Sequence, residues 1–141
     1  MPIREIHKEV LNLILHSSRS SHPNEFAGIL RAEEKRVTEV LVLPGTYSSD
    51  RSVLMRLDML PISSRACGSV HSHTSTNIRP SRADLNFFNK LGEAHVIVTP
   101  PYDETSWKAY NSRGSEISLD VVESENRELV SRKFSEDFFG T

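Results

Sequence analysis

Two histidines and an aspartate have the types and spacing that suit metal chemistry: His71, His73 and Asp84. Residues 67–73 have the composition of a β-strand, and residues two apart on a strand project from the same face, roughly 6.6 Å apart. Two imidazoles on one face can therefore converge on one cation. Alternate histidines also occur on ordinary solvent-facing strands, so the pair alone is weak evidence for a metal site.

Asp84 supplies a third donor, because it lies about one turn inside a helix that is predicted to begin at Ser81. From there its carboxylate can point back toward the preceding strand, which gives two nitrogens and one oxygen. Three protein ligands are the open set of a catalytic zinc, whose fourth position is left for water, whereas a structural zinc has four protein ligands. A zinc held in this way makes that water a nucleophile near neutral pH and polarises a carbonyl.

Ser81 and Asp84 also have a purely structural interpretation, because Ser-x-x-Asp is the spacing of a helix capping box. Capping explains these two residues but leaves the two upstream histidines unexplained. If Asp84 binds a cation, it is less available to the amide of Ser81, and the Ser81 hydroxyl could instead donate a hydrogen bond to the oxyanion of a tetrahedral intermediate. Both interpretations are open at this point.

A hydrolytic site also needs a group that takes and returns a proton, and Glu25 is the candidate. It lies in the segment 23–28, between a predicted helix and a predicted strand, and a glycine follows that permits close backbone approach. The residues alone do not separate Glu25 from Glu93 or Glu104, since solvated glutamates are common on protein surfaces.

The elements that must position these residues are helices and strands in mixed order. Apolar residues at helical spacing predict helices at 3–18, at 81–92 and, more weakly, at 124–139, with a short helix at 58–64 after a polar loop at 44–52. Strands are expected at 26–30, 37–43, 53–57, 67–73, 94–99, 106–110 and 116–122. The first two strands flank a charged turn and predict a hairpin.

Composition excludes several classes of protein. A chain of 141 residues has the size of one domain, and we expect a single domain over 1–141 with a helix or tail from about 124. A formal net charge of −2 gives no broad basic field, which argues against nucleic acid as a partner. No apolar run approaches the ~20 residues that cross a bilayer, and the start lacks the apolar stretch of a signal peptide.

The single cysteine, Cys67, cannot form an internal disulfide, which suits a reducing compartment, and we expect a cytoplasmic protein. If the strand is continuous, Cys67 lies about 13 Å from His71 along it. That distance is too long for a ligand of the same cation. We therefore expect Cys67 to pack as a small apolar residue.

The string His71-x-His73-x7-Ser81-x2-Asp84, with Glu25 upstream in Pro-x-Glu-x-x-Gly, resembles the JAMM (MPN+, JAB1/Mov34-like) zinc metalloprotease family. The resemblance extends from the first predicted helix to about residue 122. The segments 57–61, 79–81 and 101–107 are especially similar to the small single-domain archaeal members.

The resemblance implies a role for each residue of the motif. His71, His73 and Asp84 match the ligands of one Zn²⁺ per chain, Glu25 matches the general acid/base, and Ser81 matches the residue whose hydroxyl stabilises the oxyanion. It also implies an α/β (α+β) fold, in which a curved mixed β-sheet is flanked by helices as in the cytidine deaminases.

The implied activity is cleavage of an isopeptide or peptide bond after the C-terminal Gly-Gly of a ubiquitin-like modifier or sulfur-carrier protein. Two alternatives stay open: a non-catalytic module that binds a ubiquitin-like partner, and a zinc hydrolase that releases cysteine from a sulfur-carrier adduct.

Thr74 stands where the family usually has proline, at a loop position that is not a ligand. The loops at 46–52 and 100–105 are short where eukaryotic relatives grip ubiquitin, so a homodimer is one expected source of further contacts.

Overall fold

The computed structural model of the protein describes residues 2–43 and 66–123 of the 141-residue chain. The expected loop at 44–52, strand at 53–57, helix at 58–64 and tail from 124 lie outside these ranges. The described elements are β1 (Glu5–His7), α1 (Lys8–Ser21), β2 (Ala27–Glu33), β3 (Arg36–Val42), β4 (Ala66–Ser72), α3 (Arg82–Phe88), β5 (Ala94–Val98), β6 (Trp107–Tyr110), β7 (Glu116–Ile117) and β8 (Asp120–Val122).

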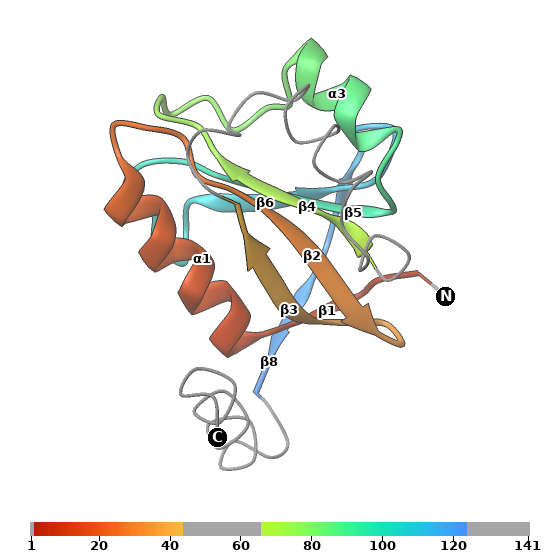
Figure 1. Cartoon of the computed structure of the whole chain (residues 1–141). Helices are drawn as coiled ribbons and strands as arrows, with labels where there is room; N and C mark the ends of the chain where they lie inside the picture. The colour runs from red at the N-terminus through yellow and green to blue at the C-terminus, as the bar shows by residue number, and fades with distance from the viewer. Residues whose placement is uncertain (1, 44–65, 124–141) are drawn as a thin grey trace.

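The strands form one mixed sheet in the order β7-β6-β5-β4-β2-β3-β1-β8. β4 is parallel to β5, and β1 is parallel to both β3 and β8, while the other neighbours are antiparallel. α1 packs on one face and α3 on the other (Figure 1). The predicted fold class, a mixed sheet flanked by helices, is confirmed. In the described ranges, neither helix is long and apolar enough to cross a membrane.

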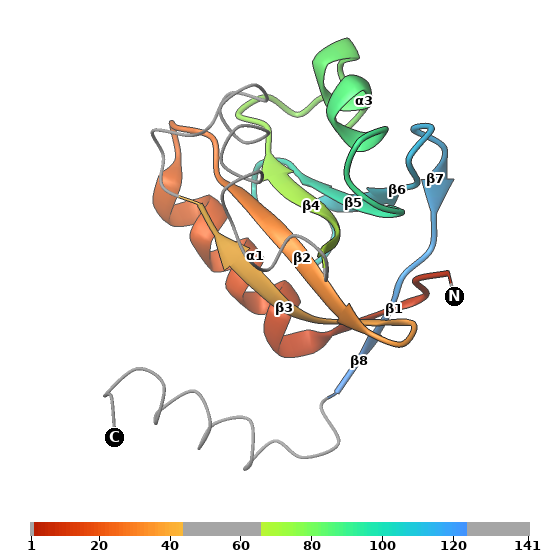
Figure 2. The same ribbon diagram turned by 45° about the vertical axis from the view of Figure 1, so that its right-hand side comes forward.

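The sheet is strongly curled, because its two edge strands are joined by a very short connection. β7 and β8 lie at opposite ends of the strand order, yet only residues 118 and 119 separate them in the chain. A flat sheet of eight strands would hold its edges about 34 Å apart, whereas this connection spans at most about 11 Å. Figure 2 shows the chain running from β7 directly to β8.

The two ends of the described chain differ from the sequence expectation. The predicted helix at 3–18 begins instead with β1, whose Ile6 is fully buried, and α1 starts only at Lys8. β1 pairs with β3 and β8 on its two sides, and these long-range contacts override the helical spacing of its apolar residues. The expected strand at 116–122 is likewise divided into β7 and β8, because Leu119 between them turns into the core.

The predicted hairpin is confirmed, with β2 and β3 joined by a tight turn in which Glu34 has φ 56°. The expected strands at 67–73, 94–99 and 106–110 are observed as β4, β5 and β6. The helix predicted for 81–92 is shorter, since α3 ends at Phe88, and Gly92 has φ 79° in the following turn. Within α3, Phe87 and Phe88 are buried, whereas Leu85 is 38% exposed.

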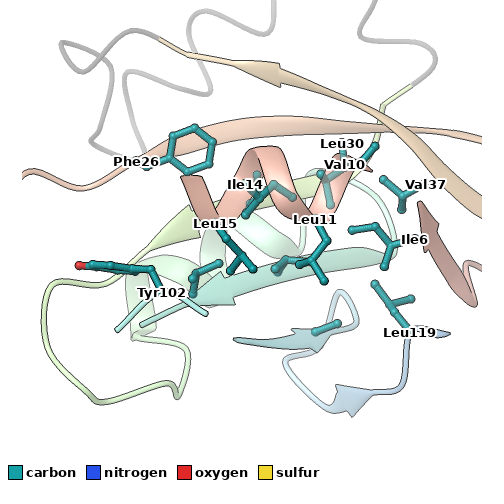
Figure 3. Close-up of a cluster of buried hydrophobic side chains, with 14 residues drawn as sticks. Ile6, Val10, Leu11, Ile14, Leu15, Phe26, Leu30, Val37, Tyr102 and Leu119 are labelled. Carbon is teal, nitrogen blue, oxygen red and sulfur yellow. The ribbon is translucent and has the colours of Figure 1, made fainter. Parts of the chain in front are cut away.

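Two apolar clusters cover the two faces of the sheet. The larger one, drawn as sticks in Figure 3, joins α1 to the sheet and consists of Ile6, Val10, Leu11, Ile14, Leu15, Phe26, Leu30, Val37, Val70, Val96, Val98, Tyr102, Ala109 and Leu119. The smaller one lies under α3 and consists of Ile29, Leu43, Phe87, Phe88, Leu91, Ile97 and Tyr110. Neighbouring strand residues such as Ile29 and Leu30 belong to different clusters. Because side chains alternate between the two faces along a strand, this fixes which face each residue of β2 occupies.

His95 is a fully buried polar residue of β5 on the α3 side. Its Nε2 lies 3.1 Å from the carbonyl oxygen of Gly92, so this nitrogen carries the proton and donates it. Its Nδ1 then accepts from the hydroxyl of Ser69 at 2.8 Å, and the ring stacks on Phe88 at 4.2 Å. Burial lowers the pKa of His95 to about 4, although the Gly92 carbonyl opposes that shift. The structure therefore holds His95 in the neutral form.

We predict that the free energy of unfolding falls as the pH drops from about 6.5 toward 4 through His95. The unfolded state binds a proton at His95 in this window and the folded state does not, so acid favours unfolding by at most about 1.4 kcal/mol per pH unit. Denaturant unfolding at several pH values should show a smaller pH dependence for His95→Gln than for the wild type. The exposed His16 provides the control: His16→Gln should keep the wild-type slope, and an unchanged slope in His95→Gln would contradict the prediction.

Candidate metal centre

The structure brings the three predicted ligands together where β4 ends and α3 begins. His71 belongs to β4, His73 directly follows its last residue, and Asp84 lies in the first turn of α3. One donor atom from each of the three lies within 4.8 Å of the others. The two imidazole rings share a face of the sheet, with centroids 5.1 Å apart, as their spacing of two residues predicts.

The carboxylate of Asp84 faces both imidazoles and is buried. Its Oδ1 lies 2.9 Å from Nε2 of His71, and its Oδ2 lies 3.1 Å from Nε2 of His73. Oδ2 also accepts the main-chain N–H of Ser81 at 2.8 Å, and the Ser81 hydroxyl accepts the N–H of Asp84 at 3.0 Å. The complete capping box is thus present together with the contacts to the histidines. The two interpretations that the sequence leaves open are both realised by one side chain.

The protonation pattern of His73 fits a bound cation. Its Nδ1 lies 2.7 Å from the main-chain oxygen of Asn77, which can only accept, so Nδ1 carries a proton. In the neutral ring, Nε2 then has only a lone pair, and this lone pair faces the oxygen of Asp84. Two acceptors in this position need a proton or a cation between them. The bond from Nδ1 to a carbonyl is also the outer contact that commonly orients a histidine ligand.

His71 supports the same conclusion. Its Nε2 is buried, and although it lies 2.9 Å from Asp84, the direction of this contact is not that of a hydrogen bond. Within the described residues this nitrogen therefore has no hydrogen-bond partner. A buried polar atom without a partner is costly, and a metal ion is one way to satisfy it. Two imidazole nitrogens and a carboxylate oxygen form a donor set that suits zinc.

The charges of the site reinforce each other. Burial alone would raise the pKa of the Asp84 carboxyl, but the imidazoles of His71 and His73 hold it well below its usual range. The contact with Asp84 raises the pKa of His73, and burial opposes this. Asp84 is therefore ionised, and the centre carries a buried negative charge that attracts positive charge between the three donors.

Glu25 lies two residues before β2, close enough to His73 for its charge to act on that imidazole. β2 and β4 pair with Ala27 opposite His71, and the pairing continues beyond β2 because the Ser72 N–H donates to the carbonyl of Phe26 at 2.8 Å. Extending this register by one residue places Glu25 opposite His73, and opposite residues of antiparallel strands share a face. The negative charge of Glu25 contributes to the raised pKa of His73.

The other two glutamates that the sequence could not separate from Glu25 occupy different places. The N–H of Glu93 donates to the carbonyl of Cys67, at the opposite end of β4 from the histidines. Glu104 is exposed in the turn after β5. Of these three glutamates, Glu25 is the one whose charge reaches His73.

Ser81 stands at the N-cap of α3, directly before the helix, and is exposed. In the cap its hydroxyl oxygen accepts the N–H of Asp84, so the hydroxyl proton is still available for another acceptor. An oxyanion beside the centre would be such an acceptor.

Sequence reasoning missed one residue that contacts the centre, Tyr102. Its hydroxyl donates to the carbonyl of His73 at 3.1 Å and lies 2.8 Å from Nδ1 of His22. Burial, and secondarily the charge of Glu25, raises the pKa of the Tyr102 phenol. Tyr102 and His22 are 80 residues apart in the chain, and no spacing rule in the sequence connects them.

Cys67 is not part of the centre. It packs against the cluster under α1, and burial raises the pKa of its thiol to about 11. The expectation that Cys67 is a packing residue is confirmed.

Comparisons with known proteins agree with this geometry. A domain family described as prokaryotic homologs of the JAB domain matches residues 7–111. A relative from Haloferax volcanii, described as a probable metalloprotease, is 39% identical over 127 residues, which cover 83% of this chain and 78% of that protein.

Solved structures give the same picture. A JAB1/MPN domain protein from Archaeoglobus fulgidus has a TM-score of 0.69 at 39% identity, covering 84% of this chain and 99% of that one. A structure described as a JAMM metalloprotease-like zinc site in the proteasome and signalosome has a TM-score of 0.68 at 36% identity, covering 86% and 99%. A protein from Desulfitobacterium hafniense, with a TM-score of 0.63 at 21% identity over 89% and 97%, shares the fold.

The family match spans most of the chain, and two solved relatives combine more than one-third identity with nearly complete coverage of their own length. These findings confirm the resemblance that the motif indicates. The chain therefore belongs to the JAMM-like (JAB1/MPN) metalloprotease family, among the prokaryotic homologs of the JAB domain.

Proposed function

We propose that this protein is a zinc-dependent isopeptidase or peptidase that cleaves after the C-terminal Gly-Gly of a ubiquitin-like modifier or sulfur-carrier protein. The observation that supports it most is the arrangement of two imidazoles and a buried carboxylate that face one point, with the charge of Glu25 acting on His73. The description of the Haloferax relative as a probable metalloprotease is a second support for peptide-bond hydrolysis.

His71, His73 and Asp84 would hold one Zn²⁺ per chain, and two of them are oriented before any ion arrives. The Asn77 carbonyl fixes the ring of His73, and the cap with Ser81 fixes the carboxylate of Asp84. A zinc held by three protein ligands acts as a Lewis acid and makes water nucleophilic near neutral pH.

The remaining steps belong to side chains of this protein. Glu25 takes a proton from the attacking water and returns it to the amine that leaves, which is general acid and base catalysis. The Ser81 hydroxyl donates to the carbonyl oxygen of the substrate as negative charge develops there. Its position at the N-terminus of α3 adds the positive end of the helix dipole to that effect.

Glu25 borders a space that could receive the tail of a substrate. An open cavity of about 300 Å³ is lined there by Glu25, Phe26, Leu43 and small serines near the end of α1, such as Ser17 and Ser20. None of His71, His73 and Asp84 lines this cavity, so it offers room for a substrate tail beside Glu25 and not at the three donors themselves. Within the described residues, β1 covers β3 only at its start, so a tail could add to the remaining edge of β3 as a strand.

Asp84→Asn should abolish stoichiometric zinc binding. Asparagine keeps an oxygen for the amide of Ser81, so the variant removes the ligand charge while the cap is retained. Its affinity for zinc should fall by more than the roughly 10- to 100-fold typical of losing an outer contact. Metal analysis after dialysis measures this, and the expected result is about one zinc per wild-type chain and almost none in the variant.

Ser81→Ala is the matched control for Asp84→Asn. It costs about 1 kcal/mol of stability through the lost cap but leaves all three donors in place, so it should keep its zinc. A full complement of zinc in Asp84→Asn would remove Asp84 from the metal centre.

Glu25→Gln should keep zinc and lose about 10²- to 10⁴-fold in the rate of cleavage, because glutamine cannot exchange a proton. The assay follows release of a ubiquitin-like protein from an isopeptide conjugate and from a linear fusion, both joined after Gly-Gly. Glu104→Gln, a change at an exposed glutamate outside the centre, should cleave at the wild-type rate.

The same assay separates the alternatives. Cleavage that persists after a chelator has removed the metal would disprove the mechanism, and an unchanged rate in Glu25→Gln would remove Glu25 from it. Tight binding of the conjugate without cleavage at saturating zinc would indicate a binding module. Release of free cysteine from a sulfur-carrier adduct, with no cleavage of protein conjugates, would indicate a small-adduct hydrolase.

A further inference from the structure

We propose that Tyr102 is a positioning residue of the metal centre: its buried hydroxyl fixes the main chain at His73, and so sets the distance between His73 and Glu25. The proposal rests on the proposed function in one respect, since it takes His73 as a metal ligand. Tyr102 touches neither the expected substrate nor the expected cation.

Tyr102 is held in an unusual backbone conformation. It lies in the turn after β5, is 4% exposed, and has φ 61°, in the left-handed region that aromatic residues rarely adopt. Its N–H donates to the carbonyl of Thr99 at 2.8 Å, and its own carbonyl accepts Nη1 of Arg19, near the end of α1, at 2.6 Å. Such conformations persist where the surroundings impose them, and they cluster at functional sites.

The side chain of Tyr102 connects three segments of the fold. Figure 3 shows its ring at the end of the cluster under α1, with the hydroxyl pointing away from the other labelled side chains. The hydroxyl has one proton, which it donates to the carbonyl of His73 at 3.1 Å. Nδ1 of His22, 2.8 Å away, must then donate to the hydroxyl oxygen. The end of α1, the turn after β5 and the end of β4 therefore meet at this hydroxyl.

These contacts determine where His73 lies. Its N–H donates to the carbonyl of Val98, its ring donates to Asn77, and its carbonyl accepts from Tyr102. His73 lies just beyond the last residue of β4, where the ladder with β5 ends. The N–H of His73 is thus held by β5, and its carbonyl, beyond the last ladder pair, is held by the hydroxyl of Tyr102. A movement there would shift the ring of His73 relative to both Asp84 and Glu25.

Tyr102→Phe tests the proposal, because it removes one oxygen and keeps the buried ring. We expect zinc to bind about 10-fold more weakly in competition with a chromophoric chelator, as for other outer contacts of metal ligands. The visible absorption spectrum of the Co²⁺-substituted protein should change, since it reports ligand geometry. On a Gly-Gly conjugate, kcat should fall while KM stays near the wild-type value.

Tyr110→Phe is the matched control. Tyr110 is 5% exposed and its hydroxyl donates to a main-chain carbonyl, that of Ile78, at 2.8 Å. The Tyr110→Phe variant therefore loses an equivalent buried hydrogen bond, whose acceptor is not one of the three candidate metal ligands. We expect wild-type zinc affinity and a wild-type Co²⁺ spectrum in Tyr110→Phe.

Two results would overturn the proposal: unchanged zinc affinity and Co²⁺ spectrum in Tyr102→Phe, or equal changes in Tyr102→Phe and Tyr110→Phe. If Tyr102→Phe does not fold, Tyr102→Met decides, because its flexible side chain fills part of the same buried space and also lacks the hydroxyl that donates to His73. The zinc affinity should then be lowered in the same direction, and no change would overturn the proposal. A wild-type protein that binds zinc but cleaves no conjugate would refute the proposed function alone, because both metal measurements remain valid tests of Tyr102.

Discussion

The register between β2 and β4 is the constraint on which the candidate centre depends. Ala27 opposes His71, and the exchange between Phe26 and Ser72 carries the pairing one step further, so Glu25 faces His73. A slip of one residue would move Glu25 out of line with His73. The core prevents such a slip, because Leu30 and Val70 must stay under α1 and Ile29 under α3. Apolar alternation along two strands thus fixes the position of an acid relative to two bases.

The short helix α3 carries Asp84, the third candidate ligand, and also Phe88, which packs beside the imidazole of His71. Phe88 contacts the ring of His71, with centroids 6.2 Å apart, and stacks on His95 at 4.2 Å. Because Phe88 is fully buried, the helix cannot rotate without exposing it, and Asp84, one turn earlier, is fixed at the same time. Burial also keeps His95 neutral, so no positive charge lies behind His71 to repel a cation. The packing of one aromatic ring therefore serves the geometry and the electrostatics of the site together.

Features that depend on local spacing could be predicted from the sequence, and features that depend on distant contacts could not. The capping box at Ser81, the hairpin of β2 and β3, and the shared face of His71 and His73 are local and are observed. Ile6 suits a helical stripe as well as a buried strand, and only its pairing with both β3 and β8 selects the strand. Glu25 could be chosen only through the resemblance to a family, because its partner is 48 residues away in the chain. The contact between Tyr102 and His73 has no counterpart in any local pattern.

The double use of Asp84 explains how a seven-residue helix can support a metal centre. A helix this short is marginal by itself, so its cap matters for its stability. A carboxylate that binds a cation can keep its cap, because it has about four acceptor positions on its two oxygens. Oδ2 receives the amide of Ser81, and Oδ1 points to His71 without a hydrogen bond of proper direction. Cation binding therefore needs no unwinding of α3. The folding of the helix has already oriented the carboxylate, which lowers the entropy cost of assembling the centre.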